Sequence, residues 1–499
     1  MLARDELTDP ERKVWEAFES GATIDLRTGN SESDDPATGE TWDTKRQIRA
    51  QLLFDLVTKA GGPAGPRSRI LRLAGARVTG TLDLEAATLA CPVLLRDCFF
   101  DEPITLTEAS ASALRLPGCH VPGLIAGQLR TQGNLELNEG FGAEGEITLR
   151  GAHVGGQLAF IEDATLMNPN GVALNGDGLT IDQAMLCYGL RAEGEMRLLG
   201  AKIGHQLTFV DATLTNPIGV ALVAESLTVD QAMLCRGGFR AEGEIILRGA
   251  RVGGQLSFED AILTNPDGVA LNLQELHAKV LLLLPETSPE GAVDLTNAQV
   301  GVFLDNEDTW PTIFAQRGFV YDALDERSQI SVEARLRWLD RDPAGYAPQP
   351  YEQLVAVYRR AGRDDDARKV AIAKQRRRRK TLNWPGKVWS SLLRWTVGYG
   401  YRTWQAGLWL LGLLAVGAAI FASAHPGDMA LAKKPGDPLP AFQPWVYSLD
   451  ALLPVVNLHQ EEFWIPEGAA RWWAWFSILA GWLLTTVVIA SLTGLLKKD

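Results

Sequence analysis

Cysteine is scarce in this sequence. Only five cysteines occur among 499 residues, an odd number, and no two of them form a CxxC pair. This composition excludes a disulfide-rich secreted scaffold and favours a reducing compartment. Cys187 and Cys235 occupy equivalent positions of a sequence repeat. We therefore expect both to pack in a core as small apolar side chains, in preference to a metal or redox role.

Clustered cations and catalytic signatures are also largely missing. The formal net charge of −13 argues against a general nucleic-acid binder, because phosphate contacts need clustered cations. The chain has no GxGxxG between a strand and a helix, no Walker loop, no GxSxG and no HExxH. We therefore predict no catalytic residue, no cofactor and no metal. The first residues, MLARDELTDPERK, contain no apolar stretch of the kind found in a signal peptide.

What the sequence does contain is a repeat. Three similar segments, AEGEITLRGAHVGGQLAF, AEGEMRLLGAKIGHQLTF and AEGEIILRGARVGGQLSF, place their first glycine at Gly145, Gly194 and Gly243, 49 residues apart. A phrase of the form NPxGVAL recurs between them. Apolar residues alternate within each copy, as in half-buried strands, and the Asn-Pro and Asn-Gly pairs suggest turns. A fixed period of this length indicates a repeat architecture.

These features predict a mainly β fold, a right-handed parallel β-helix with helical caps. We expect each superperiod to form two coils of about 24 to 25 residues. Nine or ten coils between Ile70 and Leu304, at roughly 4.8 Å each, would make a rod of about 45 Å. The repeat also aligns two columns of carboxylates, which we interpret as an exposed solubilising ridge in preference to a carbohydrate-active site: Glu144, Glu193 and Glu242, and Glu146, Glu195 and Glu244.

Helical patterns flank the repeats and suggest four regions. Residues 1–62 form an N-terminal helical cap, opened by Thr8 and Glu11 as a capping box and continued by a second helix from about Asp43. Residues 63–308 form the β-helix, and residues 309–385 a helical stalk or second cap whose hairpin turns at Ala361-Gly362. The stalk ends in five consecutive cations, which we expect at a membrane surface: Arg376, Arg377, Arg378, Arg379 and Lys380.

Residues 386–499 read as a membrane domain. Two uncharged stretches, 404–424 and 472–496, are each long enough to cross about 30 Å of hydrocarbon as a helix. Eleven of the fifteen tryptophans lie between Trp384 and Trp482, where an interfacial aromatic belt would place them. Lys and Arg are enriched in the segments just before the first span and just after the second, so we expect both termini and the β-helix in the cytoplasm.

Two segments next to the spans suggest further chemistry. Residues 396–400 spell TVGYG, the potassium-channel filter, but they precede the first span, so we favour an interfacial turn. The loop of residues 442–464 is rich in apolar residues and could be interfacial or re-entrant. We expect it on the surface with its titratable groups in water, although an ion path through an oligomer would use the same groups, Asp450, His459, Glu461 and Glu462.

Several stretches of the chain together resemble a family of bacterial membrane-associated proteins. These stretches are LTDPERKVWEAFESG, LRLAGARVTGTLDLEAATL, the AEGE coils, YAPQPYEQLVAVYRRAGRDDDARKVAIAKQRRRR, GYGYR and LDALLPVVNL. Members are often labelled membrane-associated oxidoreductase, which implies a nicotinamide or flavin site, and no residue here matches one. The sequence favours a scaffold at the inner membrane, tethered to the lipid bilayer, whose β-helix binds a protein partner or assembles with itself. An oligomeric two-span pore and an oxidoreductase remain alternatives.

Overall fold

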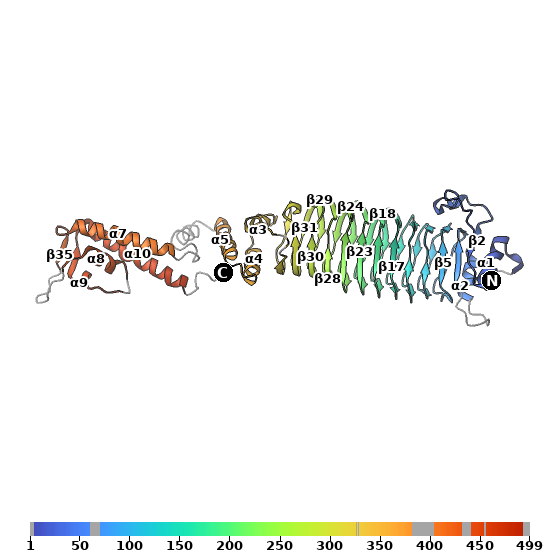
Figure 1. Cartoon of the computed structure of the whole chain (residues 1–499), viewed down its shortest axis with the longest axis horizontal. Helices are drawn as coiled ribbons and strands as arrows, with labels where there is room; N and C mark the ends of the chain where they lie inside the picture. The colour runs from blue at the N-terminus through green and yellow to red at the C-terminus, as the bar shows by residue number, and fades with distance from the viewer. Residues whose placement is uncertain are drawn as a thin grey trace. The chain divides into compact units, whose positions relative to one another are not determined.

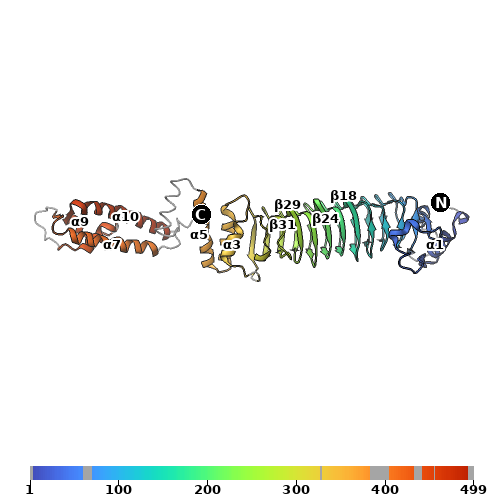
Figure 2. The same cartoon turned by 90° about the horizontal axis from the view of Figure 1, so that it is seen from above.

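The computed structural model describes residues 4–59, 70–325, 327, 329–381, 404–431, 441–453 and 456–492. The chain divides into two compact units, Met1–Gln353 and Leu354–Asp499. The first unit is built around a parallel β-solenoid of about 11 turns (Figures 1 and 2). The second unit is mainly helical. The predicted stalk, residues 309–385, is divided between them, because its first part packs on the end of the solenoid.

Two parallel sheets form the walls of the solenoid among the described residues. The larger sheet contains β1 (Ile24–Asp25), β3 (Leu71–Ala74), β5 (Val93–Arg96), β8 (Ser110–Ala111), β9 (Leu114–Arg115), β12 (Arg130–Thr131), β13 (Leu135–Glu136), β16 (His153–Val154), β17 (Leu158–Ile161), β19 (Thr180–Ile181), β20 (Met185–Tyr188), β22 (Lys202–Ile203), β23 (Gln206–Val210), β25 (Thr228–Val229), β26 (Ala232–Arg236), β28 (Arg251–Ser257), β30 (His277–Leu283), β32 (Gln299–Asp305) and β34 (Val320–Leu324). The other contains β2 (Gln47–Arg49), β4 (Arg77–Thr79), β6 (Phe99–Phe100), β7 (Ile104–Thr105), β10 (His120–Val121), β11 (Leu124–Ile125), β14 (Gly142–Ala143), β15 (Ile147–Thr148), β18 (Thr165–Asn175), β21 (Arg191–Arg197), β24 (Thr213–Val223), β27 (Arg240–Ile246), β29 (Ile262–Asn272), β31 (Glu290–Asp294) and β33 (Phe314–Ala315).

The superperiod contains two unequal coils. Strand pairing measures their lengths, because each strand residue pairs with the residue one turn later. Arg191 pairs with Thr213, and Thr213 pairs with Arg240, so the second of these coils is the longer. Some coils at either end of the solenoid are shorter still, since Val93 pairs with Leu114 and Gln299 with Val320. The expectation of equal coils was therefore wrong. The solenoid has about 11 turns because it continues past Leu304 to β34, beyond the range in which we expected nine or ten.

The longer coils owe their length to a bulge. Asn168-Pro169 and Asn170-Gly171, predicted as turns between strands, lie inside the 11-residue strand β18. Met167 pairs with Glu193 and Val172 with Glu195, so β18 uses more residues than β21 between the same two rungs. The Asn168 side-chain amide closes the bulge by donating to the Val172 carbonyl at 2.9 Å. The asparagines of β24 and β29 make the same bond.

A glycine lies directly beneath each bulge. Gly194 has φ +113°, and a Cβ on it would be 2.2 Å from the Asn168 carbonyl oxygen. Gly243 and Gly291 repeat this arrangement, with φ of +118° and +125° and a Cβ 2.4 Å from the equivalent oxygen in each case. Only glycine tolerates both this φ and this approach. The first AEGE copy differs, because Gly145 lies against Pro122 and not under a bulge.

One corner of every coil is a residue in the left-handed conformation. Each backbone N–H in the column donates to a carbonyl of the next coil, until the last, Gly318, donates to the Gln349 side chain at 2.8 Å. The column contains one residue per turn: Ala86, Glu108, Gln128, Gly151, Gly178, Gly200, Ser226, Gly249, Glu275, Asn297 and Gly318. Although φ is positive at every corner, glutamate and glutamine occupy some of them, so these corners do not require glycine, asparagine or aspartate.

Inward-facing side chains stack into one continuous core, as expected when repeats bury a face together. Phe209 lies in register between Cys187 and Cys235, and all three are fully buried. The prediction that these two cysteines pack in the core is confirmed. Burial raises the pKa of both thiols. The other three cysteines are also buried.

The N-terminal cap combines helices with strands. The helices are η1 (Arg4–Glu6), α1 (Asp9–Ser20), η2 (Pro36–Thr41) and α2 (Ala50–Lys59). Strand β1 pairs with β3 and β2 pairs with β4, so the cap extends both sheets before α2 covers the open end. The predicted second helix from about Asp43 therefore begins later, because residues 47–49 form β2. Strands at this position occupy the sheet edges that would otherwise pair with other chains.

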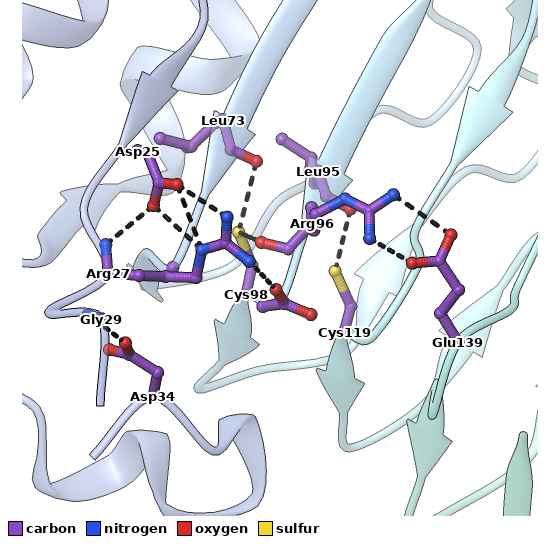
Figure 3. A network of polar contacts seen from close by, with 12 residues as sticks. Asp25, Arg27, Gly29, Asp34, Leu73, Leu95, Arg96, Cys98, Cys119 and Glu139 are labelled. Carbon is purple, nitrogen blue, oxygen red and sulfur yellow. Dashed lines mark hydrogen bonds and ion pairs between the residues drawn. The ribbon is translucent and has the colours of Figure 1, made fainter. Parts of the chain in front are cut away.

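Ion pairs fasten this cap to the first coils (Figure 3). Arg27 contacts Asp25 and Asp97, each at 2.7 Å, and Arg96 pairs with Glu139 two coils further on. At the start of α1 the Glu11 carboxylate accepts from the backbone N–H of Thr8 at 3.0 Å, as the predicted capping box requires. The same carboxylate receives Arg49 Nε at 2.7 Å, which ties α1 to β2.

The C-terminal cap follows η3 (Glu307–Thr309) and consists of α3 (Val332–Leu339) and the start of α4 (Pro348–Arg360). Trp338 closes the core by packing against Phe303, with ring centroids 6.0 Å apart. Arg335 forms two 2.6 Å hydrogen bonds with Asp305, and both side chains are at most 1% exposed. Trp310 donates to the same carboxylate at 2.7 Å.

The second unit contains the rest of α4 and α5 (Asp364–Thr381), α7 (Trp404–Ala424), β35 (Met429–Leu431), α8 (Pro444–Leu452), α9 (Gln460–Phe463), β36 (Trp464–Pro466) and α10 (Gly468–Leu492). The predicted hairpin turn is confirmed, since α4 ends at Arg360 and Gly362 has φ +72°. We call the elements from α7 to α10 the helical module.

Candidate functional site

The predicted membrane-surface cations lie at the end of α5. Three aspartates occupy the first turn of this helix and the basic run its last turns, which complements the helix dipole at both ends. Five consecutive residues of an α-helix point in every direction around its axis. The described side chains of the run, those of Arg376, Arg377 and Arg378, therefore do not share one face of the helix. Arg376 and Arg378 are exposed and Arg377 is half-buried, while the side chains of Arg379 and Lys380 lie outside the described positions.

Helix α7 has the bounds predicted for the first span, Trp404–Ala424. It contains no charged residue, and its 21 residues extend about 32 Å. Within the described part of the chain, residues Gln405–Ala424 form one helix long and apolar enough to cross a membrane, judged by length and composition. Its apolar side chains are widely exposed, as at Leu411, which is 63% exposed.

Helix α10 overlaps the second predicted span. It begins at Gly468, four residues before the predicted start, and it is described to Leu492. Arg471 lies in its first turn and donates to the Pro466 carbonyl at 3.1 Å. Several large apolar side chains of α10 are exposed, including Leu479 at 71%.

Helix α8 is the element that sequence reasoning placed least well. We expected the loop of residues 442–464 on the surface, but α8 packs against both α7 and α10. Ser448 donates to the Leu414 carbonyl at 3.2 Å, and the Leu452 carbonyl lies over Gly481. A Cβ at position 481 would be 1.9 Å from that carbonyl oxygen. Gly417 allows a similar approach by Ser448.

The end of α8 nearest the α7–α10 connection is held by an aromatic cluster. Phe421, Met429, Tyr447, Ala470 and Ala474 form its buried centre. Phe421 and Tyr447 meet edge to face with centroids 4.7 Å apart. The cluster thus joins both long helices, α8 and β35 into one packed unit.

Asp450 organises the chain that follows α8. Its carboxylate accepts backbone N–H groups from Leu458 at 2.7 Å, Gln460 at 2.9 Å and Glu461 at 3.1 Å. Asp450 is 9% exposed, so the expectation that this group lies in water was wrong. A carboxylate that accepts several backbone N–H groups fixes a reversal of the chain. His459 and Glu462 are exposed and contact each other at 3.3 Å.

A second candidate surface runs along the larger sheet of the solenoid. Eight outward-facing residues stack in register along this face: Arg130, His153, Thr180, Lys202, Thr228, Arg251, His277 and Gln299. We call them the polar ladder. At its C-terminal end the ladder borders a groove of about 480 Å³, whose lining includes Gly253, Lys279, Gly301 and Asp322. A Cβ on Gly253 or Gly301 would meet a backbone carbonyl of the preceding coil, so close stacking of the coils requires glycine at both positions.

The two glutamate columns are less regular than the repeat suggested. Thr215 lies in register between Glu193 and Glu242, so these like charges are two coils apart. Arg197 contacts Glu195 at 3.1 Å, and Asn272 donates to Glu244 at 3.3 Å. A neutral residue therefore separates the carboxylates of one column, and hydrogen bonds or ion pairs partner those of the other. This arrangement is compatible with the expected solubilising ridge.

The filter-like sequence, residues 396–400, lies outside the described residues. Across residues that the structure describes, no group of three or more His, Cys, Asp or Glu side chains is placed to hold a metal ion. Comparison of the chain with protein-family models, curated proteins and solved structures found no match, so the family resemblance stays a prediction.

Proposed function

We propose that the protein is a bacterial inner-membrane scaffold: the helical module anchors it in the lipid bilayer, and the solenoid binds a protein partner. The observation that carries the anchoring is the exposure of apolar side chains on α7, a helix with no charged residue. Full burial of a leucine side chain contributes about 1.5–3 kcal/mol, and Leu408 and Leu411, 57% and 63% exposed, forgo roughly half of it in water, so lipid is the favoured surrounding. We propose α10 as the second span of the pair.

Charge around the two helices supports a cytoplasmic position for both termini. Lys387, Arg394 and Arg402 precede α7, and Lys497 and Lys498 follow α10. The connection between the helices carries fewer cations near the span ends and five nearby carboxylates. By the positive-inside rule, the connection lies outside and the solenoid in the cytoplasm, with the basic end of α5 on the way to the membrane.

For the solenoid we propose a right-handed coil, the usual hand of parallel crossovers, and a binding role for the polar ladder. Exposed side chains in register over many coils present a regular surface to an elongated partner. The groove beside Arg251 and Lys279 adds a concave site to this surface.

Extraction and labelling test the anchoring and the topology. The full-length protein should stay in membranes washed at alkaline pH and be released by detergent. In the variant Glu467→Cys, an impermeant maleimide should label intact spheroplasts, because this residue is exposed in the connection. In the variant Arg236→Cys, at an exposed solenoid position, labelling should need permeabilised cells. The opposite labelling pattern would place the solenoid outside, and release by alkaline washing would refute the anchor.

Partner binding is tested by charge reversal at the end of the ladder and in the groove beside it, at Arg251 and Lys279. The double variant Arg251→Glu, Lys279→Glu should lose proteins that co-purify with the wild type from detergent-solubilised membranes. Arg236→Glu is the matched control, an exposed arginine on a neighbouring strand outside the ladder. Equal losses from both variants would mean that the ladder is not the binding surface.

A further inference from the structure

Helix α8 ends halfway along both long helices of the helical module. Ser448 bonds to Leu414, residue 11 of the 21 in α7, and Leu452 lies on Gly481, residue 14 of the 25 in α10. Its nine residues extend about 13 Å, less than half of the hydrocarbon thickness. The aromatic cluster holds its other end near the α7–α10 connection. α8 therefore enters beside the long helices and stops at their middle.

Residues 456–459, the next part of the chain that the structure describes after Leu453, form no helix. Leu458 reaches Asp450 within 2.7 Å, so it lies at nearly the depth at which α8 ends. Two residues later the Gln460 backbone N–H still bonds to Asp450, and its side-chain carbonyl reaches toward the start of α8, where it accepts from the Gln443 N–H at 3.5 Å. We call residues 456–459 the return segment. Val456, Asn457 and His459 within it are exposed in the single chain.

The N–H groups of Val456, Leu458 and His459 are bonded within the chain, but the exposed polar side chains of Asn457 and His459 and the carbonyls of this irregular backbone are poorly accommodated by lipid at this depth. Hydrocarbon offers no partner for backbone N–H and C=O groups, so such segments occur in membranes only when covered by protein or when lining a water-filled cavity. Given the proposed anchoring, on which this inference rests, the described residues of one copy leave the return segment uncovered. More copies of the same chain, related by a rotation axis beside α8, would supply both the cover and the cavity.

We propose that several copies of the protein assemble around the return segment, which lines a shared water-filled path for water and small ions through the middle of the membrane. A half-length helix followed by irregular backbone between two spans is the arrangement by which channels place backbone groups around an aqueous path. Asp450 acts here as a positioning residue, because its three backbone contacts hold the return segment in place. No other class of partner is required.

Single cysteines distinguish the path from a lipid-facing surface. All five native cysteines are buried, so introduced ones report cleanly. Val456→Cys replaces a side chain of the return segment that is 42% exposed. Leu411→Cys is the matched control, an apolar residue of α7 that is 63% exposed and faces lipid under this proposal. The full-length variants are purified, reconstituted in liposomes and treated with a small water-soluble methanethiosulfonate.

The thiol of the Val456→Cys variant should react about tenfold faster than that of Leu411→Cys, because water reaches the first position and not the second. Mild oxidation should cross-link copies of the Val456→Cys variant to each other, and modification of its thiol should reduce the flux of a small ion across the liposomes. Gly481→Leu, which removes the seat of the Leu452 carbonyl, should abolish flux and leave solenoid melting unchanged.

A monomer in mass photometry, with the two introduced thiols equally unreactive, would overturn the inference. Such a protein that still resists alkaline extraction would keep the proposed anchor and lose only the path, so the two failures are distinguishable.

Discussion

Replacing Gly194 by alanine tests the stacking of the bulged coils directly. The new Cβ would lie 2.2 Å from the Asn168 carbonyl oxygen and 2.8 Å from that of Gly171, both backbone atoms that cannot rotate away. The backbone would also stay at φ +113°, where alanine is strained. Strain of about 1–2 kcal/mol and overpacking of about 1–3 kcal/mol give an expected loss of roughly 3 kcal/mol.

A control in the same coil separates the two contributions. Gly200 also has a positive φ, +62°, but a Cβ on it would have no other atom within 4 Å. Gly200→Ala should therefore cost only the strain, about 1–2 kcal/mol. Both variants are compared by chemical unfolding followed by circular dichroism, with amide hydrogen exchange of β18 and β21 as a local readout, since repeat proteins can unfold in parts.

A double variant completes the experiment. Deleting residues 168–171 should remove the bulge and with it the obstacle to a side chain at position 194. Gly194→Ala should then cost about as little as Gly200→Ala, a coupling of about 1–3 kcal/mol between neighbouring sites. Equal losses from the two single variants, or an unchanged cost of Gly194→Ala after the deletion, would refute the account of the long coils.

Three further perturbations have definite signs. Burial alone would raise the pKa of Glu11, but hydrogen bonds from its arginine partner and Thr8 outweigh it and lower the pKa from 4.5 to about 2. The ionised Glu11 thus stabilises the folded state above about pH 4.5, and this stabilisation is lost as pH falls toward 2. Glu11→Gln should cost about 2 kcal/mol of unfolding free energy at pH 7, a value discounted because the arginine is partly exposed. Thermal melts near pH 2 should show no difference between this variant and the wild type. Asp305→Asn should cost about 3–5 kcal/mol in chemical unfolding, because it removes the carboxylate that pairs with the buried Arg335 guanidinium. Glu307→Gln removes an exposed pair with Arg337 and should stay within about 1 kcal/mol. Deleting residues 194–242 removes one short and one long coil and should give a folded protein by circular dichroism; a deletion of half that length ending within a coil should not, and equal damage would contradict the superperiod.

The solenoid was predictable because its period is written in the sequence, whereas the inequality of its coils was not. Asn-Pro and Asn-Gly are turn signals in isolation. In this chain the register of the neighbouring strand continues on both sides of them, so tertiary pairing converts a turn into a bulge within β18. A local signal was that a glycine follows the last residue of each NPxG after 23 or 24 residues, at Gly194, Gly243 and Gly291.

In the helical module the bounds of the first long helix were predictable from the sequence, whereas the packing of α8 was not. The bounds of α7 follow from its apolar composition alone. The seat of α8 depends on Gly417 and Gly481, which in an apolar run resemble any other small residue. Asp450 likewise gave no sign of its role, because its three partners are backbone groups of residues that follow an irregular stretch, and backbone groups carry no sequence signature.

The bulges also determine the spacing at which features repeat along the solenoid surface. Backbone spacing repeats with every coil, at roughly 4.8 Å, but the bulges of β18, β24 and β29 recur on every second coil, at roughly twice that distance. The surface therefore carries two spacings, that of the bulges and the shorter one of the coils. A partner that contacts the bulges can therefore shift along the solenoid only in steps of about 10 Å. Ile218, fully exposed at the middle bulge between Asn170 and Asp267 at the others, makes even those steps unequal.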